Sequence, residues 1–405
     1  MVGRERSPVC CRSVSPTPKL ASLSFVSKFS ARLRAMPPTR RTRKSPSSRR
    51  TWSADTELVG ITFTLTSTEN AKLYPQYAIG LHAWFLDCVR QGDPNLSAYL
   101  HDGQSDKPFT VSELDGPMVG AKQLQLVAGE TYQWTITALS PVLVQWLHEW
   151  MKNLPDRVTL RNAPLAIKSC RVSHPATTYD RLWNDGTEKS LALHFTSPTS
   201  FRRKGHHLPL PWPTNVFHSY LRRWNHFSSR PFDQEEFLAW VDEGTIIRRH
   251  QLESVKVAAG KKGSVTGFVG TIEYGLSKEA RSHPQFEQLF FALGRLAPYC
   301  GTGHKTTFGL GQTRLGWSLE REDRPEIIPV QEQLARRIEQ LTEQLMARQK
   351  RTGGQRAIQV CQTRATILAR REFGESLQEI AEDLEMRYDT VKTYAKLARR
   401  ALRVD

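Results

Sequence analysis

The chain has 405 residues, enough for two or three domains, and carries a formal net charge of +17 with a sequence pI near 9.8. This excess favours a polyanion partner or an anionic membrane surface. No apolar run of about 18 residues is present, which excludes a transmembrane helix and a membrane-spanning role. The six cysteines form no C-x-x-C pair, which argues against a structural zinc site and a disulfide framework. We therefore expect no metal, no cofactor and a reducing, cytoplasmic setting.

The first segment, residues 1–53, is rich in Arg, Ser and Pro and is predicted to be disordered. Residues 1–50 hold thirteen Lys and Arg against one acid, Glu5, so most of the net charge lies there. Two other interpretations are open. The composition also resembles a transit peptide, and Met36 is an alternative start of the protein. Residues 38–50 would add nonspecific RNA affinity.

The next segment, residues 54–172, has the order of a ferredoxin-like unit, with strand, helix, strands, helix and strand. We expect strands at 58–66, 109–114, 123–128, 131–139, 157–160 and 166–172, helices at 78–90 and 141–152, and a loop at 91–108. Alternation of apolar side chains supports the first strand. One broad apolar face supports the first helix, and His82 lies within that face.

Residues 173–320 repeat a related order. We expect a strand at 191–197, helices at 213–227 and 232–240, a hairpin of strands 246–258 and 264–276, a helix at 284–296 and a last strand at 312–319. The predicted fold class is therefore α+β, with two ferredoxin-like domains in tandem followed by an all-α C-terminal module.

The C-terminal part divides into a linker helix within 321–355 and a module at 356–405. Leu334, Ile338, Leu341 and Leu345 recur at heptad-like spacing in the linker helix, which is too short for a stable isolated coiled coil. Ser376 and Glu379 form a capping box ahead of a short helix. A second helix starts at 389, with Val391, Tyr394, Leu397, Ala398 and Leu402 predicted inward and Lys392, Lys396, Arg399 and Arg400 outward.

This helix-turn-helix pattern with a basic second helix resembles the C-terminal DNA-binding region of sigma factors. It predicts DNA binding through the four outward cations. A helical bundle used for protein contact is the alternative.

A Gly-rich loop at 300–313 precedes the last predicted strand. It contains Gly301, Gly303, Gly309 and Gly311, with His304 and Lys305 between them. Glycine adopts positive φ and lets backbone approach a ligand, so we expect the loop to hold RNA phosphates with its amides and cations. The spacing is not that of a Walker A loop, and an ordinary turn is the alternative.

Several motifs together resemble one family. They are the Gly-rich loop and the segments 81–86, 109–112, 195–204 and 209–225. In this order they resemble the CRISPR repeat-cleaving endoribonucleases, the sixth Cas family of the RAMP superfamily, over residues 57–318. The resemblance implies tandem ferredoxin-like folds and metal-independent cutting of CRISPR precursor RNA. The cut is an attack of the 2′-hydroxyl on the adjacent phosphate, which leaves a 2′,3′-cyclic phosphate.

Such chemistry needs a base, an acid and positive charge around the phosphorane. The resemblance implies that His82 is catalytic, whereas a half-buried helix histidine is the structural alternative. Tyr77 is the expected helper, and no Lys lies between Ala83 and Val89, so the positive charge is assigned to Lys305 or to residues 202–204. Arg202, Arg203 and Lys204 form an expected phosphate clamp. The other candidate histidines are His101, His206, His207 and His304.

The sequence thus predicts an endoribonuclease whose active site lies between the two halves. Two other hypotheses are open: a catalytically inactive RNA-binding subunit, and a DNA-binding regulator acting through the C-terminal module. The expected partners are the precursor RNA repeat, other subunits of a CRISPR effector complex, and DNA.

Overall fold

The computed structural model describes residues 52–101, 106–119, 124–161, 163–203, 206–258, 264–318, 327–348 and 354–402. Predictions for residues 1–51, for Lys204 and for the hairpin tip at 261–262 lie outside these residues. Among the described residues, no helix is long and apolar enough to cross a membrane.

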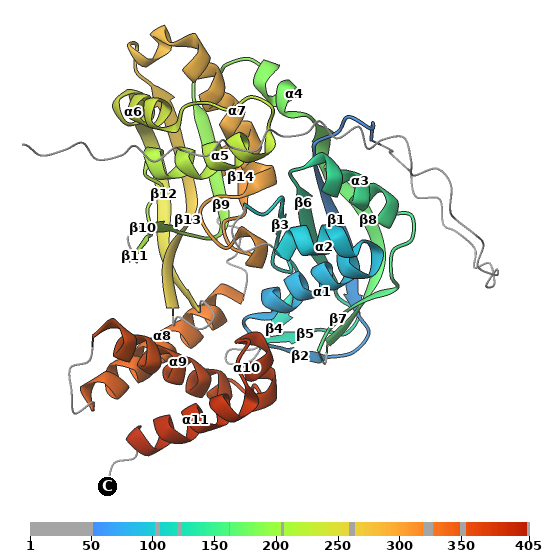
Figure 1. Ribbon diagram of the computed structural model, residues 1–405, viewed down its shortest axis with the longest axis vertical. Coiled ribbons are helices and arrows are strands. Elements are labelled where there is room, and N and C mark those ends of the chain that lie inside the picture. The colour runs from blue at the N-terminus through green and yellow to red at the C-terminus, as the bar shows by residue number, and fades with distance from the viewer. Residues whose placement is uncertain are drawn as a thin grey trace, which may run out of the picture. The chain divides into compact units, whose positions relative to one another are not determined.

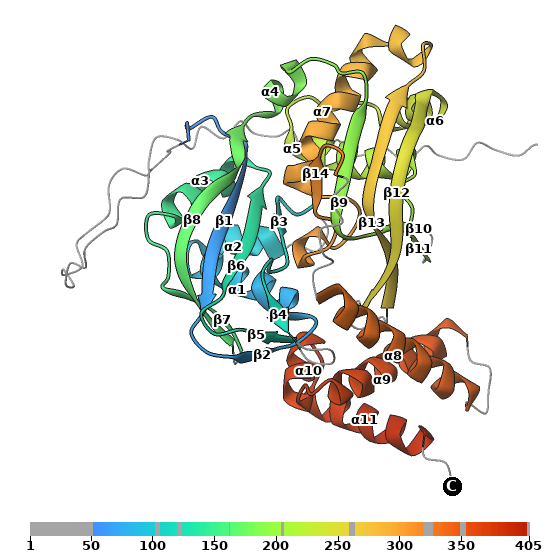
Figure 2. The ribbon, with the colours of Figure 1, turned by 180° about the vertical axis from the view of Figure 1, so that it is seen from behind.

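The first domain is a five-stranded antiparallel sheet with helices on one face (Figures 1 and 2). The strand order is β3-β6-β1-β8-β7. The strands are β1 Leu58–Ser67, β3 Phe109–Val111, β6 Thr131–Ala138, β7 Arg157–Leu160 and β8 Ala163–Thr177. The helices are α1 Tyr77–Gly92, α2 Pro94–His101 and α3 Pro141–Trp150. A small second sheet contains β2 Ala71–Leu73, β4 Met118–Val119 and β5 Leu124–Leu126.

The central strand β1 explains the position of this core. Val59, Ile61, Phe63 and Leu65 alternate along it and are fully buried, as expected for a strand flanked on both sides and covered by helices. Phe63 lies 5.3 Å from Trp134 of β6, ring centroid to ring centroid. Trp84 of α1 lies 5.6 Å from the same Trp134 ring, ring centroid to ring centroid, so α1 packs on this sheet.

The loop expected at 91–108 is wrong in part, because it contains the helix α2. Asp93 caps this helix, since its Oδ1 accepts hydrogen bonds from the backbone N–H groups of Asn95 and Leu96, both at 3.0 Å. Pro94 occupies the first helical position, where its missing N–H costs nothing. An Asp-Pro pair is compatible with a loop and also with the start of a helix.

The second domain has a four-stranded antiparallel sheet in the order β12-β13-β9-β14, again with helices on one face (Figure 2). Its strands are β9 Leu191–Thr199, β12 Thr245–Ala258, β13 Ser264–Leu276 and β14 Thr313–Leu315, with a separate hairpin of β10 Phe201–Arg203 and β11 His206–Leu208. Its helices are α4 Tyr179–Asn184, α5 Pro213–Phe227, α6 Gln234–Gly244 and α7 Pro284–Cys300. The strand expected at 312–319 ends at Leu315, where Gly316 has φ 101° and leaves the extended conformation.

The C-terminal part consists of α8 Ile327–Ala347, α9 Gln355–Glu372, α10 Leu377–Asp383 and α11 Tyr388–Leu402. The predicted linker helix is not a spacer, because Leu334, Ile338, Leu341 and Leu345 of α8 are buried in one cluster with residues of α9 and α11. The capping box at Ser376 and Glu379 is confirmed. Leu397 was predicted inward and is 39% exposed, because Ala395 takes the buried position in that turn of α11.

A buried ionic network fastens α10 to the first domain. Arg370 is fully buried and bonds Glu375 and Asp383. Asp383 also pairs with Arg161, which follows β7. The Tyr74 hydroxyl donates to Glu379 at 3.0 Å. The C-terminal module is therefore docked on the first domain through specific polar contacts.

Candidate active site

His82 lies on α1 at the boundary between the first domain and the Gly-rich loop of the second. Its ring lies between two aromatic rings, with centroids 5.6 Å from Phe109 of β3 and 4.4 Å from Phe308 of the loop. The side chain is half-buried. The helix predicted around His82 and its place between the halves are thus both found.

One hydrogen bond determines which ring nitrogen of His82 carries the proton. The His82 Nδ1 lies 3.0 Å from the carbonyl oxygen of Thr307. A carbonyl oxygen only accepts, so Nδ1 carries the proton and Nε2 of the neutral imidazole is an acceptor. Burial lowers the pKa of His82 to about 4. The ring is therefore neutral near pH 7, with a lone pair on Nε2, which is the state of a general base.

The Gly-rich loop connects α7 to β14 and includes a short 3-10 turn, η3 Thr306–Phe308. Gly301, Gly303, Gly309 and Gly311 all have positive φ, between 64° and 86°. A Cβ on Gly311 would lie 2.1 Å from the carbonyl oxygen of Thr302. At Gly303 and Gly311 backbone packs directly on backbone, whereas at Gly309 the space is taken by the Glu113 side chain.

The amides of these four glycines are already used inside the protein, so the expected contact of the loop with RNA phosphates would depend on His304 and Lys305. The N–H of Gly301 donates to the Ala297 carbonyl at 2.9 Å, and the N–H of Gly303 donates to Ser219 Oγ at 2.9 Å. The N–H of Gly309 donates to the Val111 carbonyl at 3.1 Å, and the N–H of Gly311 donates to the Pro198 carbonyl at 3.1 Å. All four glycines are buried. They shape the loop and do not present donors to a ligand.

Arg223 of α5 anchors the loop from beneath. Its buried guanidinium donates to the Ser219 carbonyl, the Gly303 carbonyl and Thr306 Oγ1 at 2.9, 3.1 and 3.3 Å. Arg223 lies within the segment 209–225 that carries the family resemblance, and the sequence alone did not indicate these partners. One feature of the sequence does indicate a buried arginine. Arg223 lies beside Trp224 within the otherwise apolar stripe of α5, where an arginine must find acceptors inside the protein.

The loop is joined to the first domain by backbone contacts. Gly309 forms a parallel bridge with Ser112, and Gln312 Nε2 donates to the Val111 carbonyl at 3.3 Å. Thr137 of β6 also donates to the carbonyl of Tyr299 at the end of α7. The acceptor that orients His82 is therefore supplied by the second domain, and the site depends on both halves.

Lys305 lies two residues before Thr307 in the same loop. Its φ of 61° is left-handed, a conformation that non-glycine residues adopt at a cost and that is enriched at functional sites. Lys305 therefore lies on the same loop as Thr307, which accepts the hydrogen bond of His82, and its catalytic role stays a prediction.

A basic cluster lies next to Lys305 on the second domain. The His304 ring centroid is 4.8 Å from that of His207, and His207 pairs with the exposed Arg202 across the β10–β11 hairpin. Burial first, then His207, Lys305 and Arg202, lowers the pKa of His304 to about 4. The side chains of Arg203 and Lys204 lie outside the described residues.

The Tyr77 hydroxyl lies in the core of the first domain. The residue is 5% exposed, and its hydroxyl accepts the backbone N–H of Leu114 at 3.0 Å. The structure therefore shows a packing contact for Tyr77, and its catalytic role stays a prediction.

Glu113 and Gln331 were not predicted, and they connect α8 to this region. Gln331 Nε2 donates to Glu113 Oε1 at 2.6 Å and to the Pro75 carbonyl at 3.3 Å. Burial raises the pKa of Glu113 to about 7. A Cβ on Gly309 would meet Glu113 Cγ at 2.5 Å. These contacts join three distant segments, so no local pattern could have indicated them.

The predicted DNA-contacting residues Lys392, Lys396, Arg399 and Arg400 are all exposed on α11. They belong to the C-terminal module and are separate in the chain from the loop that carries Lys305.

Comparison with models of known protein families gives one match in each of the two sheet domains and one in the C-terminal module. Residues 61–185 match the model of the CRISPR Cas6 N-terminal domain, and residues 193–313 match that of the CRISPR-associated endoribonuclease Cas6. Residues 362–402 match the model of sigma-70 region 4. No curated protein matches the chain.

Solved structures similar to this chain have the same tandem domains. The product complex of one Cas6 (TTHA0078) is 27% identical with a TM-score of 0.51, over 64% of this chain and 99% of that chain. The product complex of another Cas6 (TTHB231) is 22% identical with a TM-score of 0.54, over 64% of this chain and 100% of that chain. The Thermus thermophilus Cas6 (TTHB231) is 21% identical with a TM-score of 0.50, over 65% and 100%. The tandem ferredoxin-like fold and the sigma-like helical module predicted from the sequence are confirmed.

Proposed function

We propose that this chain, which belongs to the Cas6 family of CRISPR-associated endoribonucleases through residues 61–185 and 193–313, cuts CRISPR precursor RNA within its repeats without a metal ion. The observation that carries the proposal is the bond between His82 Nδ1 and the Thr307 carbonyl. It leaves Nε2 as a proton acceptor at the boundary of the two domains. A similar Cas6 structure, 27% identical, is described as a product complex, which supports an RNA substrate.

In the proposed reaction the RNA supplies its own nucleophile. His82 Nε2 takes the proton of the 2′-hydroxyl, and the 2′-oxygen forms a bond with the adjacent phosphorus. The bond from phosphorus to the 5′-oxygen breaks, and that oxygen takes up a proton. The products are a 2′,3′-cyclic phosphate and a 5′-hydroxyl end. General base catalysis of this kind contributes about 10²–10⁴-fold.

The phosphorane carries an additional negative charge, which needs a cation close by. Lys305 is the proposed source, because it lies on the loop that orients His82. Arg202, Arg203, Lys204 and His304 are proposed to contact phosphates of the bound RNA. The exposed Arg202 and the neighbouring His304 lie beside Lys305, so the backbone would follow the second domain toward His82.

Cleavage of labelled repeat RNA by the full chain in EDTA tests the proposal. We expect cleavage by the unchanged protein and a loss of at least about 10²-fold in the single-turnover rate for His82→Ala, with RNA affinity retained. His148→Ala is the matched control, because His148 is also a half-buried histidine on a helix of the first domain. It should cleave normally.

A substrate with a 2′-deoxynucleotide at the cut should bind and remain uncut, since its nucleophile is missing. Unchanged cleavage by His82→Ala would remove His82 from the mechanism. Binding without cleavage by the unchanged protein would favour an inactive RNA-binding subunit instead.

A further inference from the structure

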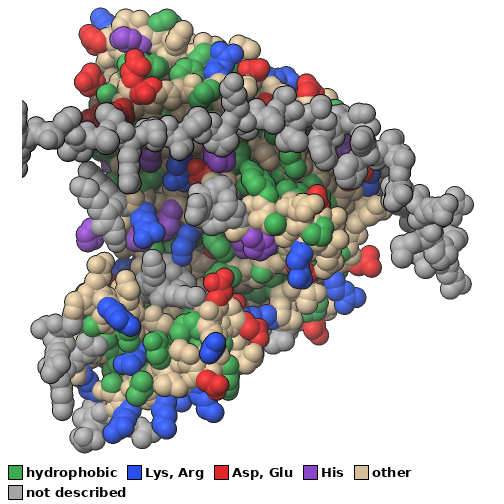
Figure 3. Space-filling model, in the orientation of Figure 1, with side chains coloured by type: hydrophobic (Ala, Val, Ile, Leu, Met, Phe, Trp, Pro, Cys, Tyr) green, Lys and Arg blue, Asp and Glu red, His purple; other side chains and the backbone are tan. Residues whose placement is uncertain are grey.

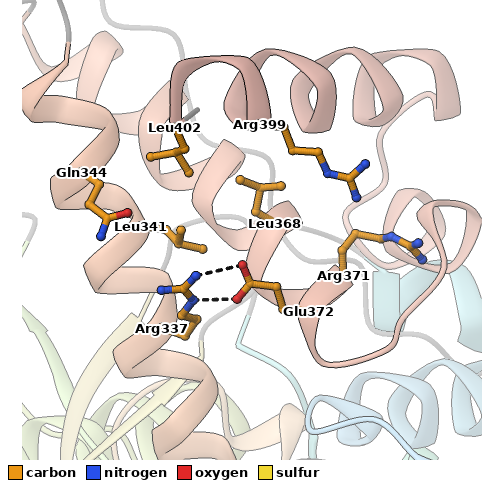
Figure 4. A pocket seen from close by; sticks show the side chains of 8 residues that line it. All are labelled: Arg337, Leu341, Gln344, Leu368, Arg371, Glu372, Arg399 and Leu402. Carbon is orange, nitrogen blue, oxygen red and sulfur yellow. Dashed lines mark hydrogen bonds and ion pairs between the residues drawn. The ribbon is translucent and has the colours of Figure 1, made fainter. Parts of the chain in front are cut away.

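A groove lies within the C-terminal module, between α8, α9 and α11. It encloses about 470 Å³ and is lined by Arg337, Leu341, Gln344, Leu368, Arg371, Glu372, Arg399 and Leu402 (Figure 4). Three leucines form its apolar floor. The charged residues stand around them, so the groove has both an apolar surface and a polar rim.

The charges of the rim do not cancel. Arg337 binds Glu372 with two hydrogen bonds, Nε to Oε2 at 2.6 Å and Nη2 to Oε1 at 2.9 Å. That pair is internally neutral. Arg371 and Arg399 have no acidic partner among the residues that the structure describes. Figure 4 shows their guanidinium groups extending on the side of the groove away from Arg337. The groove therefore has a net positive charge.

One of these arginines also has an unused donor. Arg371 Nη1 donates to the Glu375 carbonyl at 2.5 Å, whereas its buried Nε has no hydrogen-bond partner within the described part of the chain. A buried donor without an acceptor is unfavourable, and an anionic ligand that reached this nitrogen would supply the acceptor.

The groove continues a basic stripe on α11. Lys392, Lys396 and Arg399 are four and three residues apart, which places them on one side of the helix, and all are exposed. Figure 3 shows Lys and Arg side chains gathered over this helix. Arg399 belongs to both features, so a polyanion that follows the stripe reaches the groove.

We propose that the stripe and the groove bind a single-stranded RNA segment that flanks the cleaved repeat. Its phosphates pair with Arg371 and Arg399, and one unpaired base lies on Leu341, Leu368 and Leu402. A duplex keeps its base faces stacked inside and has nothing to place on an apolar floor, which favours a single strand. The inference rests on the proposed function, since it takes the precursor RNA as the ligand.

The docked position of the module supports the same ligand. The contacts of Arg161 with Asp383 and of Tyr74 with Glu379 hold α10 on the first domain. An RNA already held by the catalytic domains would therefore meet the groove at high effective concentration. A second contact region on the same strand then adds affinity without changing the chemical step.

The test measures the affinity of the full chain for two labelled RNAs: a repeat alone, and a repeat with a single-stranded extension on one side, tested for each side. We expect Arg371→Ala/Arg399→Ala to weaken binding of an extended RNA by about tenfold or more and to leave binding of the bare repeat unchanged. The logarithm of the binding constant for the extended RNA falls linearly with the logarithm of the salt concentration. The slope of that line should become shallower by about 0.7 for each lost phosphate contact.

The control double variant is Arg336→Ala/Arg356→Ala, which removes the same charge from exposed positions of α8 and α9 outside the groove. It should bind both RNAs like the unchanged protein. Arg399→Ala alone changes an exposed side chain and keeps the test valid if loss of Arg371 disturbs the fold. It should show the same selective loss, to a smaller extent.

Equal weakening for both RNAs, no weakening, or the same loss in the control would overturn the inference. So would a duplex DNA that binds more tightly than the extended RNA and depends on the same two arginines. Single-turnover cleavage of the bare repeat is followed in parallel. If no protein cleaves but the selective loss of affinity remains, the proposed function fails and the flank-binding groove stands.

Discussion

His82 Nδ1 lies 3.0 Å from the carbonyl oxygen of Thr307, 225 positions further along the chain. The ring belongs to a helix of the first domain, and its acceptor belongs to a loop of the second. The base is thus assembled only when the two domains are docked. Changes at the domain boundary should therefore affect cleavage even where they leave each sheet intact.

The first prediction concerns pH. Because burial lowers the pKa of His82 to about 4, the neutral, active base persists down to that pH. The pH dependence of kcat/KM reports the pKa values of the free enzyme. As the pH rises, we expect kcat/KM to increase tenfold per pH unit up to about pH 4 and then to become independent of the protonation of His82. An acid limb near pH 6.5 would show that the imidazole is solvated and would contradict the structure.

The free energy of unfolding must be followed in the same experiment, because three histidines have a lowered pKa and the protein can unfold at acid pH. The pKa values of His82, His174 and His304 are all lowered to about 4, mainly by burial. A histidine whose folded-state pKa is depressed stabilises the fold above its ordinary pKa, about 6.5, and loses that contribution as the pH falls toward 4. Each can reduce the unfolding free energy by up to about 1.4 kcal/mol per pH unit in that window. Circular dichroism at each pH identifies where unfolding begins.

The second prediction concerns Phe308, whose ring centroid lies 4.4 Å from that of His82. Phe308→Ala should admit water to the imidazole, raise the pKa of His82 and move the acid limb of kcat/KM upward. The rate should fall by roughly tenfold, as expected for the loss of about 0.5–1.5 kcal/mol of ring packing. Phe232→Ala removes a ring stacked on Trp183 elsewhere in the second domain and should leave the limb in place. A lower rate with an unmoved limb would mean a purely structural role.

The third prediction compares two glycines with positive φ. Gly309→Ala places a Cβ 2.5 Å from Glu113 Cγ, whereas Gly316→Ala meets nothing within 4 Å. Each substitution costs about 1–2 kcal/mol of folding free energy, because alanine is forced into the left-handed conformation. Only Gly309→Ala also disturbs the hydrogen bond from the residue 309 N–H to the Val111 carbonyl. Denaturant unfolding and single-turnover cleavage should both be impaired more by Gly309→Ala. Equal effects would show that the Gly309 contact is not needed for docking.

The regular elements could be predicted because their patterns are local. The apolar alternation of β1, the broad face of α1 and the capping box at Ser376 each signal a structure within a few residues. The helix around His82 was predicted in the same way, whereas the catalytic role of His82 rests on the family resemblance and stays a prediction. The helix α2 was missed because Asp93-Pro94 reads equally as a turn and as a helix start.

The Gly-rich loop shows what local patterns cannot decide. Four glycines predict positive φ and close approach, and both are found, but the approaching group is the protein's own backbone. Whether amides face a ligand or Pro198, Ser219 and Val111 depends on contacts made across the fold. The partners of Arg223 and Glu113 could not be predicted for the same reason, since they lie in distant segments.

The last prediction concerns the network that fastens the C-terminal module. Arg370 and Glu375 are both fully buried, and they bond through Nε and Oε1 at 2.8 Å and through a second close contact. Glu375→Gln would leave the Arg370 charge with only Asp383 as its acidic partner inside the protein. Removing one partner of a buried pair costs about 3–5 kcal/mol when the remaining charge is uncompensated, so with Asp383 still paired to Arg370 we expect a loss of free energy of unfolding below that range. Glu339→Gln is the matched control, since its pair with Lys256 is much more exposed and such pairs contribute about 0–1 kcal/mol. Hydrogen exchange of α9, α10 and α11 measures the difference. It should be confined to these helices, because the hydrogen bonds of Arg370 within the described residues go to Glu375 and Asp383 and not to the loop that orients His82. Similar exchange in the two variants would show that Asp383 alone compensates Arg370, and that α10 is held by its apolar contacts.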